Sequence, residues 1–342
     1  MNIQQALDAL TTLERTSRAK HGLPPDHLLD WSQYPFSFAK QQLAQLSEQV
    51  DAVVRFQPGG EHLEGINAFL TAARGDYAGA DEAMRRFQAL EPHNPIARIR
   101  LTERSASQEA FPPVLGSWPH DPSLFIVCDP SYFTQFAIPL LKSIARHAAG
   151  ARVHIHVMGL QPTGHLPPGL NITVTHEDPA QFIASRRIQP ANYYHSARFV
   201  RFAEALEKSP TLLMMDADCI ATGDPRPLLD GRSAAARVRA GRIEPWNQLS
   251  ACLVRGTEAS RSYFCAAANV VRLHIAHPFW GLDQYALFSA YLQERPEIEL
   301  LGPDVASVAA DTPGLFWYTA GKRKEILAEG ETAFAQLYRS YL

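Results

Sequence analysis

The sequence predicts an α/β fold, a mixed and mainly parallel sheet with flanking helices, preceded by an α-helical module. From Ser123 onward, stretches typical of strands alternate with stretches typical of helices, which is the order that builds parallel sheets. Residues 212–215 form a continuous apolar run, as expected for a strand buried on both faces. Residues 1–110 show helical periodicity and no convincing strand.

The N-terminal module, residues 1–110, contains one suggestive unit at residues 65–99. This unit resembles a tetratricopeptide repeat. The small or apolar packing positions of its second helix are taken by Ala80, Met84 and Phe87. One repeat is too few for an independent solenoid. We therefore expect a short module packed on the next domain, serving either structural support or the binding of a protein partner.

A proline-rich segment at residues 111–122 predicts a linker, and residues 123–342 form the second domain. The first strands expected there are residues 123–129, 152–160 and 171–177. A helix is expected over residues 135–148. A right-handed crossover between parallel strands would bring Asp129 and Asp216 to the same edge of the sheet.

Two aspartates follow the apolar run directly. Side chains two residues apart along a strand share a side, so Asp216 and Asp218 can point together. Open α/β sheets bind their ligands at this end of the strands. Oxygen ligands of this kind suit Mg²⁺ or Mn²⁺, completed by waters and substrate phosphates. The alternative is a solvated turn, but the buried strand before the pair favours a metal site.

Four segments of the second domain carry motifs in a fixed order: a strand followed by Asp-x-x-Tyr, a Tyr-Tyr/Arg helix leading to Asp-x-Asp, an Asp-Gln segment, and a basic segment. They are residues 123–147, 193–229, 280–287 and 317–324. Together they resemble the retaining, metal-dependent GT-A glycosyltransferases related to glycogenin and the bacterial galactosyltransferases. The resemblance implies a GT-A (Rossmann-like) fold, a UDP-sugar donor and transfer with retention.

The resemblance implies that Asp129 and Tyr132 bind the nucleotide. Asp129 would accept hydrogen bonds from uracil or ribose, and Tyr132 would stack on the base. From the residues alone, Asp129 can equally cap the following turn, and Tyr132 can equally pack in the core.

Arg198 matches the family arginine that reaches toward the metal-binding aspartates and the donor. A guanidinium offsets clustered carboxylate charge and resists deprotonation, and Arg201 is a competing candidate for this role. Asp283 and Gln284 match the family's segment beside the donor sugar, where their oxygens would hold hydroxyls and stabilise an oxocarbenium-like transition state. Helix capping by Asp283 is the alternative.

Phe279 and Trp280 lie just before this segment and are expected to shield the apolar face of the sugar. Lys322 and Lys324 match the family's phosphate-contacting segment and would neutralise the diphosphate. A solvated basic turn is the alternative for these lysines.

The sequence departs from the family at two points. The family's C-terminal histidine ligand is absent, and Tyr318 or Thr319 falls near its place, which leaves the third metal ligand to water or a backbone carbonyl. Ser250 takes the place of a family asparagine, so we expect it at the donor site with altered sugar contacts.

Composition excludes several classes of function. The net charge of −3 gives no electrostatic footprint for nucleic acid. The sequence contains no run of about 18 apolar residues, so no transmembrane helix is expected. The N-terminus lacks the pattern of a secretory signal. The four cysteines show no Cys-x-x-Cys spacing and are interpreted as buried thiols in a reducing, cytoplasmic compartment.

Two classes of function remain. One is metal-dependent transfer from a UDP-sugar to an unknown acceptor, which the sequence leaves open among glycan, lipid-linked sugar, small molecule and protein. The other is a non-catalytic helical-repeat adaptor with a degenerate transferase domain. A nucleotidyltransferase is disfavoured because no glycine-rich loop follows the first strand. The aspartate pair, Arg198 and the Asp-Gln segment favour the enzyme.

Overall fold

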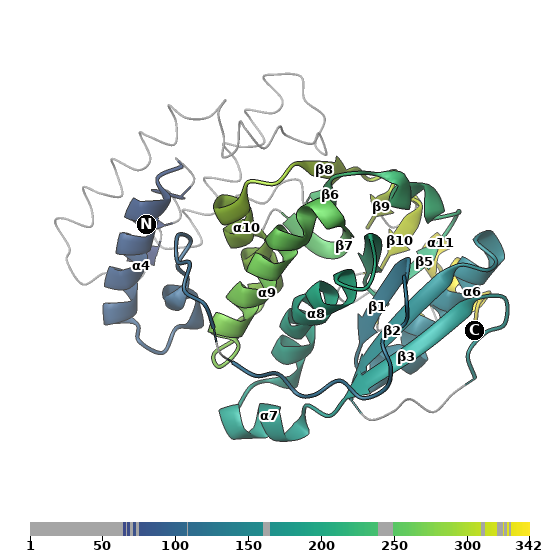
Figure 1. The fold of residues 1–342 in the computed structure, drawn as a ribbon, viewed down its shortest axis with the longest axis horizontal. Helices are drawn as coiled ribbons and strands as arrows, with labels where there is room; N and C mark the ends of the chain where they lie inside the picture. Colours follow the sequence, from purple (N-terminus) through teal and green to yellow (C-terminus); the bar gives the residue numbers. More distant parts are fainter. Residues whose placement is uncertain are drawn as a thin grey trace, which may run out of the picture.

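The chain forms a mixed α/β structure, seen in a computed structural model (Figure 1), and this confirms the predicted class. The structure describes residues 75–107, 109–159, 165–238, 249–308, 312–319 and 330–342, together with residues 64, 65, 67, 68, 71, 72, 324 and 327. Among these residues, no helix combines the length and the apolar character needed to cross a membrane.

The central sheet has seven strands in the order β3-β2-β1-β4-β7-β6-β8. They are β1 (Leu124–Cys128), β2 (Arg152–Met158), β3 (Asn171–Glu177), β4 (Thr211–Met215), β6 (Ala234–Val238), β7 (Leu249–Thr257) and β8 (Ile298–Leu301). Strands β1 to β4 are parallel, whereas β7 is antiparallel to both β4 and β6. The chain winds outward from β1 to β3 and returns on the other side of β1 as β4, so the strand order reverses between β1 and β4.

A small second sheet lies beyond the end of β4 and has the order β5-β10-β9. Its strands are β5 (Cys219–Ala221), β9 (Ala306–Ser307) and β10 (Phe316–Tyr318). The α-helices are α4 (Tyr77–Leu90), α5 (Pro130–Tyr132), α6 (Ile138–His147), α7 (Ala180–Arg186), α8 (Pro190–Leu206), α9 (Arg261–His274), α10 (Leu282–Glu294) and α11 (Ala333–Arg339). A π-helical turn spans Phe133–Ala137, and short 3-10 turns span Pro95–Arg98, Arg226–Asp230 and Glu258–Ser260.

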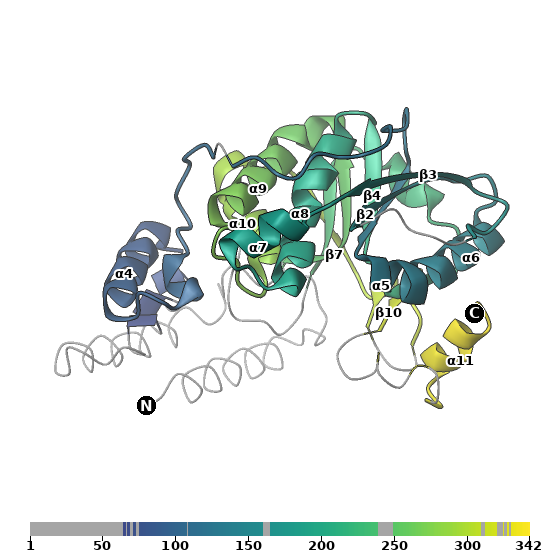
Figure 2. The ribbon, with the colours of Figure 1, turned by 90° about the horizontal axis from the view of Figure 1, so that it is seen from below.

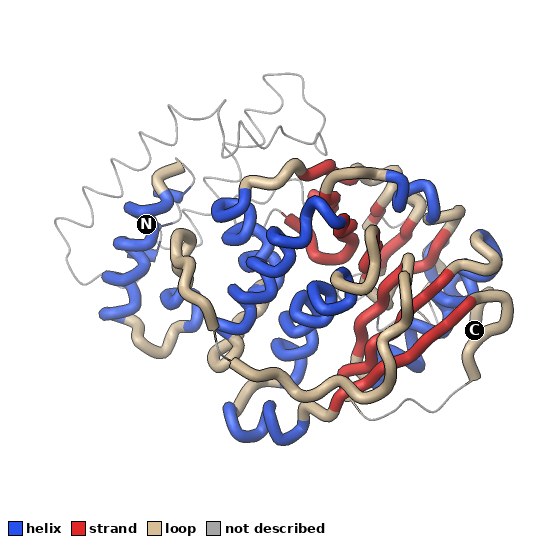
Figure 3. Tube along the Cα trace, in the orientation of Figure 1, coloured by secondary structure: helices blue, strands red, loops and turns tan. Residues whose placement is uncertain are grey.

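Both faces of the central sheet are buried. Phe125 and Val127 of β1 pack with α8, α9 and α10, whereas Leu124 and Ile126 pack with α6 on the opposite face. The residues of β4 alternate in the same way. Figure 3 shows helices on either side of the strands. Continuous apolar runs are therefore required in both strands, because each face needs its own row of apolar side chains.

Helix α4 packs against the second domain. Its buried side chains belong to the same apolar cluster as α9 and α10, and the ring of Tyr77 meets that of Phe288 edge-on with 5.8 Å between centroids. Figure 2 shows α4 beside α9 and α10. The described part of the N-terminal module thus shares a core with the second domain. Most of residues 1–74 lies outside the described residues, so the tetratricopeptide resemblance stays a prediction.

The segment expected to be a linker, residues 111–122, is packed along the sheet. Leu115 N–H donates to the His176 carbonyl at 2.7 Å. The Trp118 indole contacts the ring of His154 at a tilt of 46°, with 5.0 Å between centroids. Phe111 packs on Tyr193, with centroids 6.0 Å apart. The segment therefore covers β2 and β3 and the start of α8.

The cysteines only partly follow the prediction of buried thiols. Cys128 and Cys219 are buried, Cys252 is half-buried, and Cys265 is exposed on α9. All four lie in the described part of the chain, and no disulfide joins them.

Candidate functional site

A cavity of about 290 Å³ opens at the carboxyl ends of β1, β2 and β4. It is lined by Val127, Cys128, Asp129, Tyr132, Met158, Ala191, Tyr194, His195, Arg198, Asp216, Ala217, Asp218 and Lys324. This is the point where the strand order reverses, and open α/β sheets bind their ligands in the crevice at such a point. The topology therefore singles out this cavity as the candidate site, and its volume is close to the lower limit for small-molecule pockets, roughly 300 Å³.

Asp216 and Asp218 form the acidic wall of the cavity. They follow Met215, the last residue of β4, and the Asp216 N–H donates to the Cys252 carbonyl at 2.8 Å, which fixes the turn. Asp218 is 7% exposed. Burial, together with the negative charge of Asp216, raises the pKa of Asp218. Two carboxylates so close favour a cation between them.

Arg198 bridges two carboxylates. One terminal nitrogen donates to Asp216 and the other to Asp283. Burial acts to lower the pKa of Arg198, but the charges of Asp216 and Asp283 outweigh it and raise that pKa. Arg201, the competing candidate, lies one turn further along α8 and pairs with Glu177 instead. Arg198 is therefore the arginine at the site.

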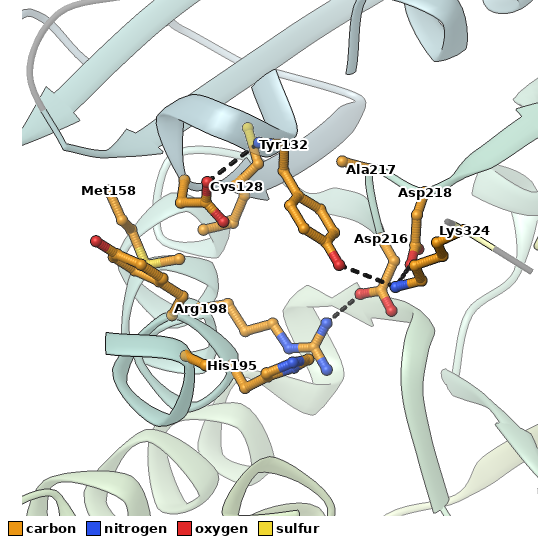
Figure 4. Close-up of a pocket in the computed structure, with 13 residues that line it drawn as sticks. Cys128, Tyr132, Met158, His195, Arg198, Asp216, Ala217, Asp218 and Lys324 are labelled. Atoms are coloured by element: carbon orange, nitrogen blue, oxygen red, sulfur yellow. Dashed lines mark hydrogen bonds and ion pairs between the residues drawn. The ribbon is translucent and has the colours of Figure 1, made fainter. Parts of the chain in front are cut away.

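Lys324 lies between the acidic wall and Tyr132 (Figure 4). Its Nζ pairs with Asp218 and donates to the Tyr132 hydroxyl at 3.0 Å. Burial acts to lower the pKa of Lys324, but the Asp218 carboxylate outweighs it and raises that pKa. Lys322, which was expected beside it, lies outside the described residues. In this structure Lys324 neutralises the carboxylate to which a metal was assigned from the sequence.

Asp129 caps α5. Its Oδ1 accepts hydrogen bonds from the N–H groups of Ser131 and Tyr132, at 2.8 and 3.1 Å. Both bonds go to the same oxygen, and Asp129 also lines the cavity. The capping role and a ligand contact through Oδ2 are therefore compatible. Tyr132 packs its ring on Phe136, with 4.8 Å between centroids, and still lines the cavity.

Asp283 and Gln284 lie behind Arg198. Both are buried in the first turn of α10, and neither lines the cavity. Asp283 accepts a hydrogen bond from the Gln284 N–H at 2.8 Å in addition to the bond from Arg198, but it does not cap α10, whose N-cap is Gly281. Asp283 thus meets the site through the arginine, and a direct contact of Asp283 and Gln284 with a donor sugar stays a prediction.

Two further expectations differ from the structure. Ser250 is buried on β7, its hydroxyl donates to the Cys252 sulfur at 3.2 Å, and it does not line the cavity. Phe279 is buried and packs on Tyr285, with centroids 5.9 Å apart, whereas Trp280 is exposed. The two neighbouring aromatics therefore face different environments and cannot shield one sugar together.

The structure adds Tyr194 and His195 to the cavity wall. Both are on α8, and His195 lies three residues before Arg198, so the two share a helix face. This three-residue spacing can be read from the sequence, and it indicates that His195 lies on the same helix face as Arg198. Burial lowers the pKa of His195, which favours the neutral ring.

Thr319 lies opposite Asp218 at the end of the small sheet. Tyr318 of β10 is paired with Cys219 of β5, and the next N–H, that of Thr319, donates to the Asp218 carbonyl at 3.1 Å. Directly opposed residues of antiparallel strands place their side chains on the same face. The Thr319 hydroxyl is buried and has no hydrogen-bond partner in the described part of the chain, an arrangement that costs free energy.

These residues fit a divalent cation in their chemistry. Among the described residues, no group of three or more His, Cys, Asp and Glu side chains is placed to hold a metal. Asp216 and Asp218 nevertheless offer carboxylate oxygens, which suit Mg²⁺ or Mn²⁺ when waters and phosphates complete the coordination. Thr319 does not line the cavity, but its backbone pairing with Asp218 makes its hydroxyl a candidate third oxygen. Such an ion would also satisfy the unpartnered hydroxyl.

Comparison with known proteins found similar solved structures only. No family model and no curated protein matches the chain. The similar structures include the glycosyltransferase GlyE of Streptococcus pneumoniae TIGR4 (13% identity, 65% of this chain and 60% of that chain, TM-score 0.45). They also include the galactosyltransferase LgtC in complex with donor and acceptor sugar analogues (13%, 64% and 94%, TM-score 0.47) and the bifunctional glycosyltransferase WbbM (11%, 89% and 63%, TM-score 0.47). The chain spans less than two thirds of the length of GlyE and WbbM.

Proposed function

We propose that this chain transfers a sugar from a nucleoside-diphosphate sugar, specifically a UDP-sugar, to an acceptor with the help of Mn²⁺ or Mg²⁺. The observation that carries the proposal is the cavity at the strand-order reversal, where Asp216 and Asp218 face the cationic groups of Arg198 and Lys324. Carboxylates hold a divalent cation, and cations neutralise phosphate. A diphosphate is the ligand that binds both the divalent cation and the cationic side chains.

The acidic wall supplies the metal ligands in this proposal. Asp216, Asp218 and Thr319 would hold the cation, and when bound it would stabilise the charge on the departing diphosphate. Asp218 must first exchange its pairing with Lys324. The lysine is then available to donate to a phosphate oxygen, a charge-assisted hydrogen bond of the strong class.

The opposite side of the cavity suits the nucleoside. Asp129 has Oδ2 available to accept from a ribose hydroxyl or a base N–H, since the capping bonds use Oδ1. Val127 and Met158 give this side an apolar lining, and the ring of Tyr194 supplies an aromatic surface on which a base can stack.

At the sugar end, Arg198 is the central positioning group. It pairs with Asp216 of the acidic wall and with Asp283 behind it, so the position of the metal-binding carboxylate of Asp216 depends on both Arg198 and Asp283. We propose retention of the anomeric configuration, which the sequence resemblance supports. Nuclear magnetic resonance of the product anomer would test this.

We further propose a cytoplasmic location. The support is that the four cysteines form no disulfide and that Cys265 is exposed, a pattern that favours a reducing compartment.

The test is a screen of nucleotide-sugar hydrolysis, with and without Mn²⁺, across UDP-, GDP- and CMP-sugars. We expect slow, Mn²⁺-dependent release of UDP from at least one UDP-sugar in the absence of acceptor. Preference for a GDP- or CMP-sugar would show that the nucleotide is wrongly assigned. Neither hydrolysis nor nucleotide binding under any of these conditions would instead favour the non-catalytic adaptor.

A further inference from the structure

Trp280 presents its indole to solvent beside the candidate site. The residue is 69% exposed, more than any other large hydrophobic residue in the described part of the chain. A single exposed apolar residue is ordinary on a protein surface. Trp280 differs because its neighbours fix it in place and connect it to the cavity wall.

The loop before α10 directs this side chain outward. Phe279 is buried, and Gly281 adopts φ +92°, a left-handed conformation that favours glycine. The side-chain amide of Asn192 donates to the Pro278 carbonyl at 3.3 Å, which ties the loop to α8. The indole is therefore held by a buried neighbour on one side, a turn on the other and a contact to the helix that carries Arg198.

His195 connects the indole to the cavity. Its ring meets the Trp280 ring edge-on, with 4.3 Å between centroids. His195 lines the cavity and Trp280 does not. The aromatic surface thus continues outward from the cavity wall, on the side of Arg198.

We propose that Trp280, supported by His195, is the platform on which the sugar ring of the acceptor lies. The inference rests on the proposed function and adds the class of acceptor, a carbohydrate. A pyranose has a face of C–H groups that packs against an indole while its hydroxyls reach outward, and covering the exposed indole removes apolar surface from water. The platform is assigned to the acceptor because it lies outside the cavity that holds the nucleotide and the diphosphate.

The experiment measures binding of methyl β-D-galactopyranoside and methyl β-D-glucopyranoside to the full chain by ligand-observed nuclear magnetic resonance, with and without UDP and Mn²⁺. Wild type is compared with Trp280→Ala, with Trp280→Tyr and with Leu166→Ala, which removes another exposed apolar side chain away from the cavity. UDP affinity is measured for the same four proteins by calorimetry.

We expect glycoside binding to be about fivefold weaker in Trp280→Ala, the size of an aromatic contact. Trp280→Tyr retains most of the binding, Leu166→Ala behaves as wild type, and UDP affinity is the same in all four. Unchanged glycoside affinity in Trp280→Ala, no glycoside binding by wild type, or an equal loss of UDP affinity would overturn the platform. Failure of the proposed function would be shown separately, by the absence of UDP binding to wild type. In that case the glycoside titration without UDP still tests whether Trp280 binds a sugar ring.

Discussion

At the scale of single residues, charge and hydrogen bonding divide the site into paired and unpaired groups. Asp216 and Asp218 each have one cationic partner, whereas the buried Thr319 hydroxyl has no hydrogen-bond partner among the described residues. The sequence predicts the two aspartates because they follow an apolar strand directly. The resemblance places Tyr318 or Thr319 near the missing histidine ligand without making either a ligand, because the strand that brings Thr319 to Asp218 is distant in sequence and its register is set by tertiary contacts.

Replacing Thr319 with valine removes the hydroxyl and keeps the shape. Without metal, we expect Thr319→Val to raise the free energy of unfolding by about 1 kcal/mol, since an unsatisfied buried group is removed. With Mn²⁺ and UDP, the same variant should show a smaller rise in melting temperature than wild type. Thr319→Ser, which keeps the hydroxyl, is the control. A valine variant that is destabilised without metal and retains the full response to Mn²⁺ would exclude Thr319 as a ligand.

Lys324 competes with a cation for Asp218, so its removal should have opposite effects on two ligands. In Lys324→Gln we expect Mn²⁺ alone to bind more tightly, because the carboxylate has lost its ammonium partner. UDP in the presence of Mn²⁺ should bind more weakly by roughly 1.5–3 kcal/mol, the range for a charged hydrogen bond. Calorimetric titration of each ligand measures both. Effects of the same sign on Mn²⁺ and on UDP would contradict the exchange of partners.

At the scale of elements, α8 and α10 place the charged groups. Arg198 and Arg201 are three residues apart, yet one bonds Asp216 and the other Glu177. The sequence narrows the choice to these two arginines, and the family resemblance selects Arg198. The sequence does not predict that Phe279 is buried while Trp280 is exposed, because two adjacent aromatic residues in a loop carry no periodic pattern.

Helix α10 is anchored to the segment that follows α4. The Tyr285 hydroxyl donates to the Arg100 carbonyl at 2.5 Å and accepts from the Arg100 N–H at 3.1 Å. Because Asp283 lies in the same helical turn, we expect Tyr285→Phe to lower the free energy of unfolding by about 1–3 kcal/mol and to reduce donor hydrolysis.

The control for this prediction is Arg85→Ala, which breaks an exposed pair with Glu82 on α4. Such a surface pair contributes little, so both donor hydrolysis and stability should stay at the wild-type level. Equal loss of hydrolysis in the two variants would mean that the helical module acts on the donor site through its surface and not through α10.

At the scale of the whole molecule, the topology explains why the site lies where it does. The alternation of strands and helices after Ser123 is readable from the sequence, and so is the buried character of β1 and β4. The strand order is not, since it depends on which strands pair. The reversal between β1 and β4 opens the cavity, and the sequence places Asp129 and Asp216 at one edge only through the crossover rule.

Stability of the whole chain should fall in acid because of one buried histidine, His154, and one half-buried histidine, His274. Burial lowers the pKa of His154 to about 3 and that of His274 to about 4, whereas the unfolded value is about 6.5. The unfolded state therefore binds more protons than the folded state between these pKa values. The contribution of the two neutral histidines to stability is complete above pH 6.5 and is lost as the pH falls. Urea unfolding should show a loss of roughly 2 kcal/mol per histidine between about pH 6.5 and pH 5. In His154→Gln the pH dependence should shrink by that amount, and a pH dependence equal to that of wild type would contradict the assignment.

The most direct test of the central claim is calorimetric titration of UDP with and without Mn²⁺. The wild-type chain should bind UDP far more tightly with Mn²⁺, and Asp218→Asn should lose this dependence while remaining folded. The matched control is Asp224→Asn, which alters a half-exposed carboxylate that pairs with Arg226 outside the cavity and should behave as wild type. Equal UDP affinity of wild type with and without Mn²⁺, or unchanged Mn²⁺-dependent binding in Asp218→Asn, would contradict a metal–diphosphate site at the end of β4.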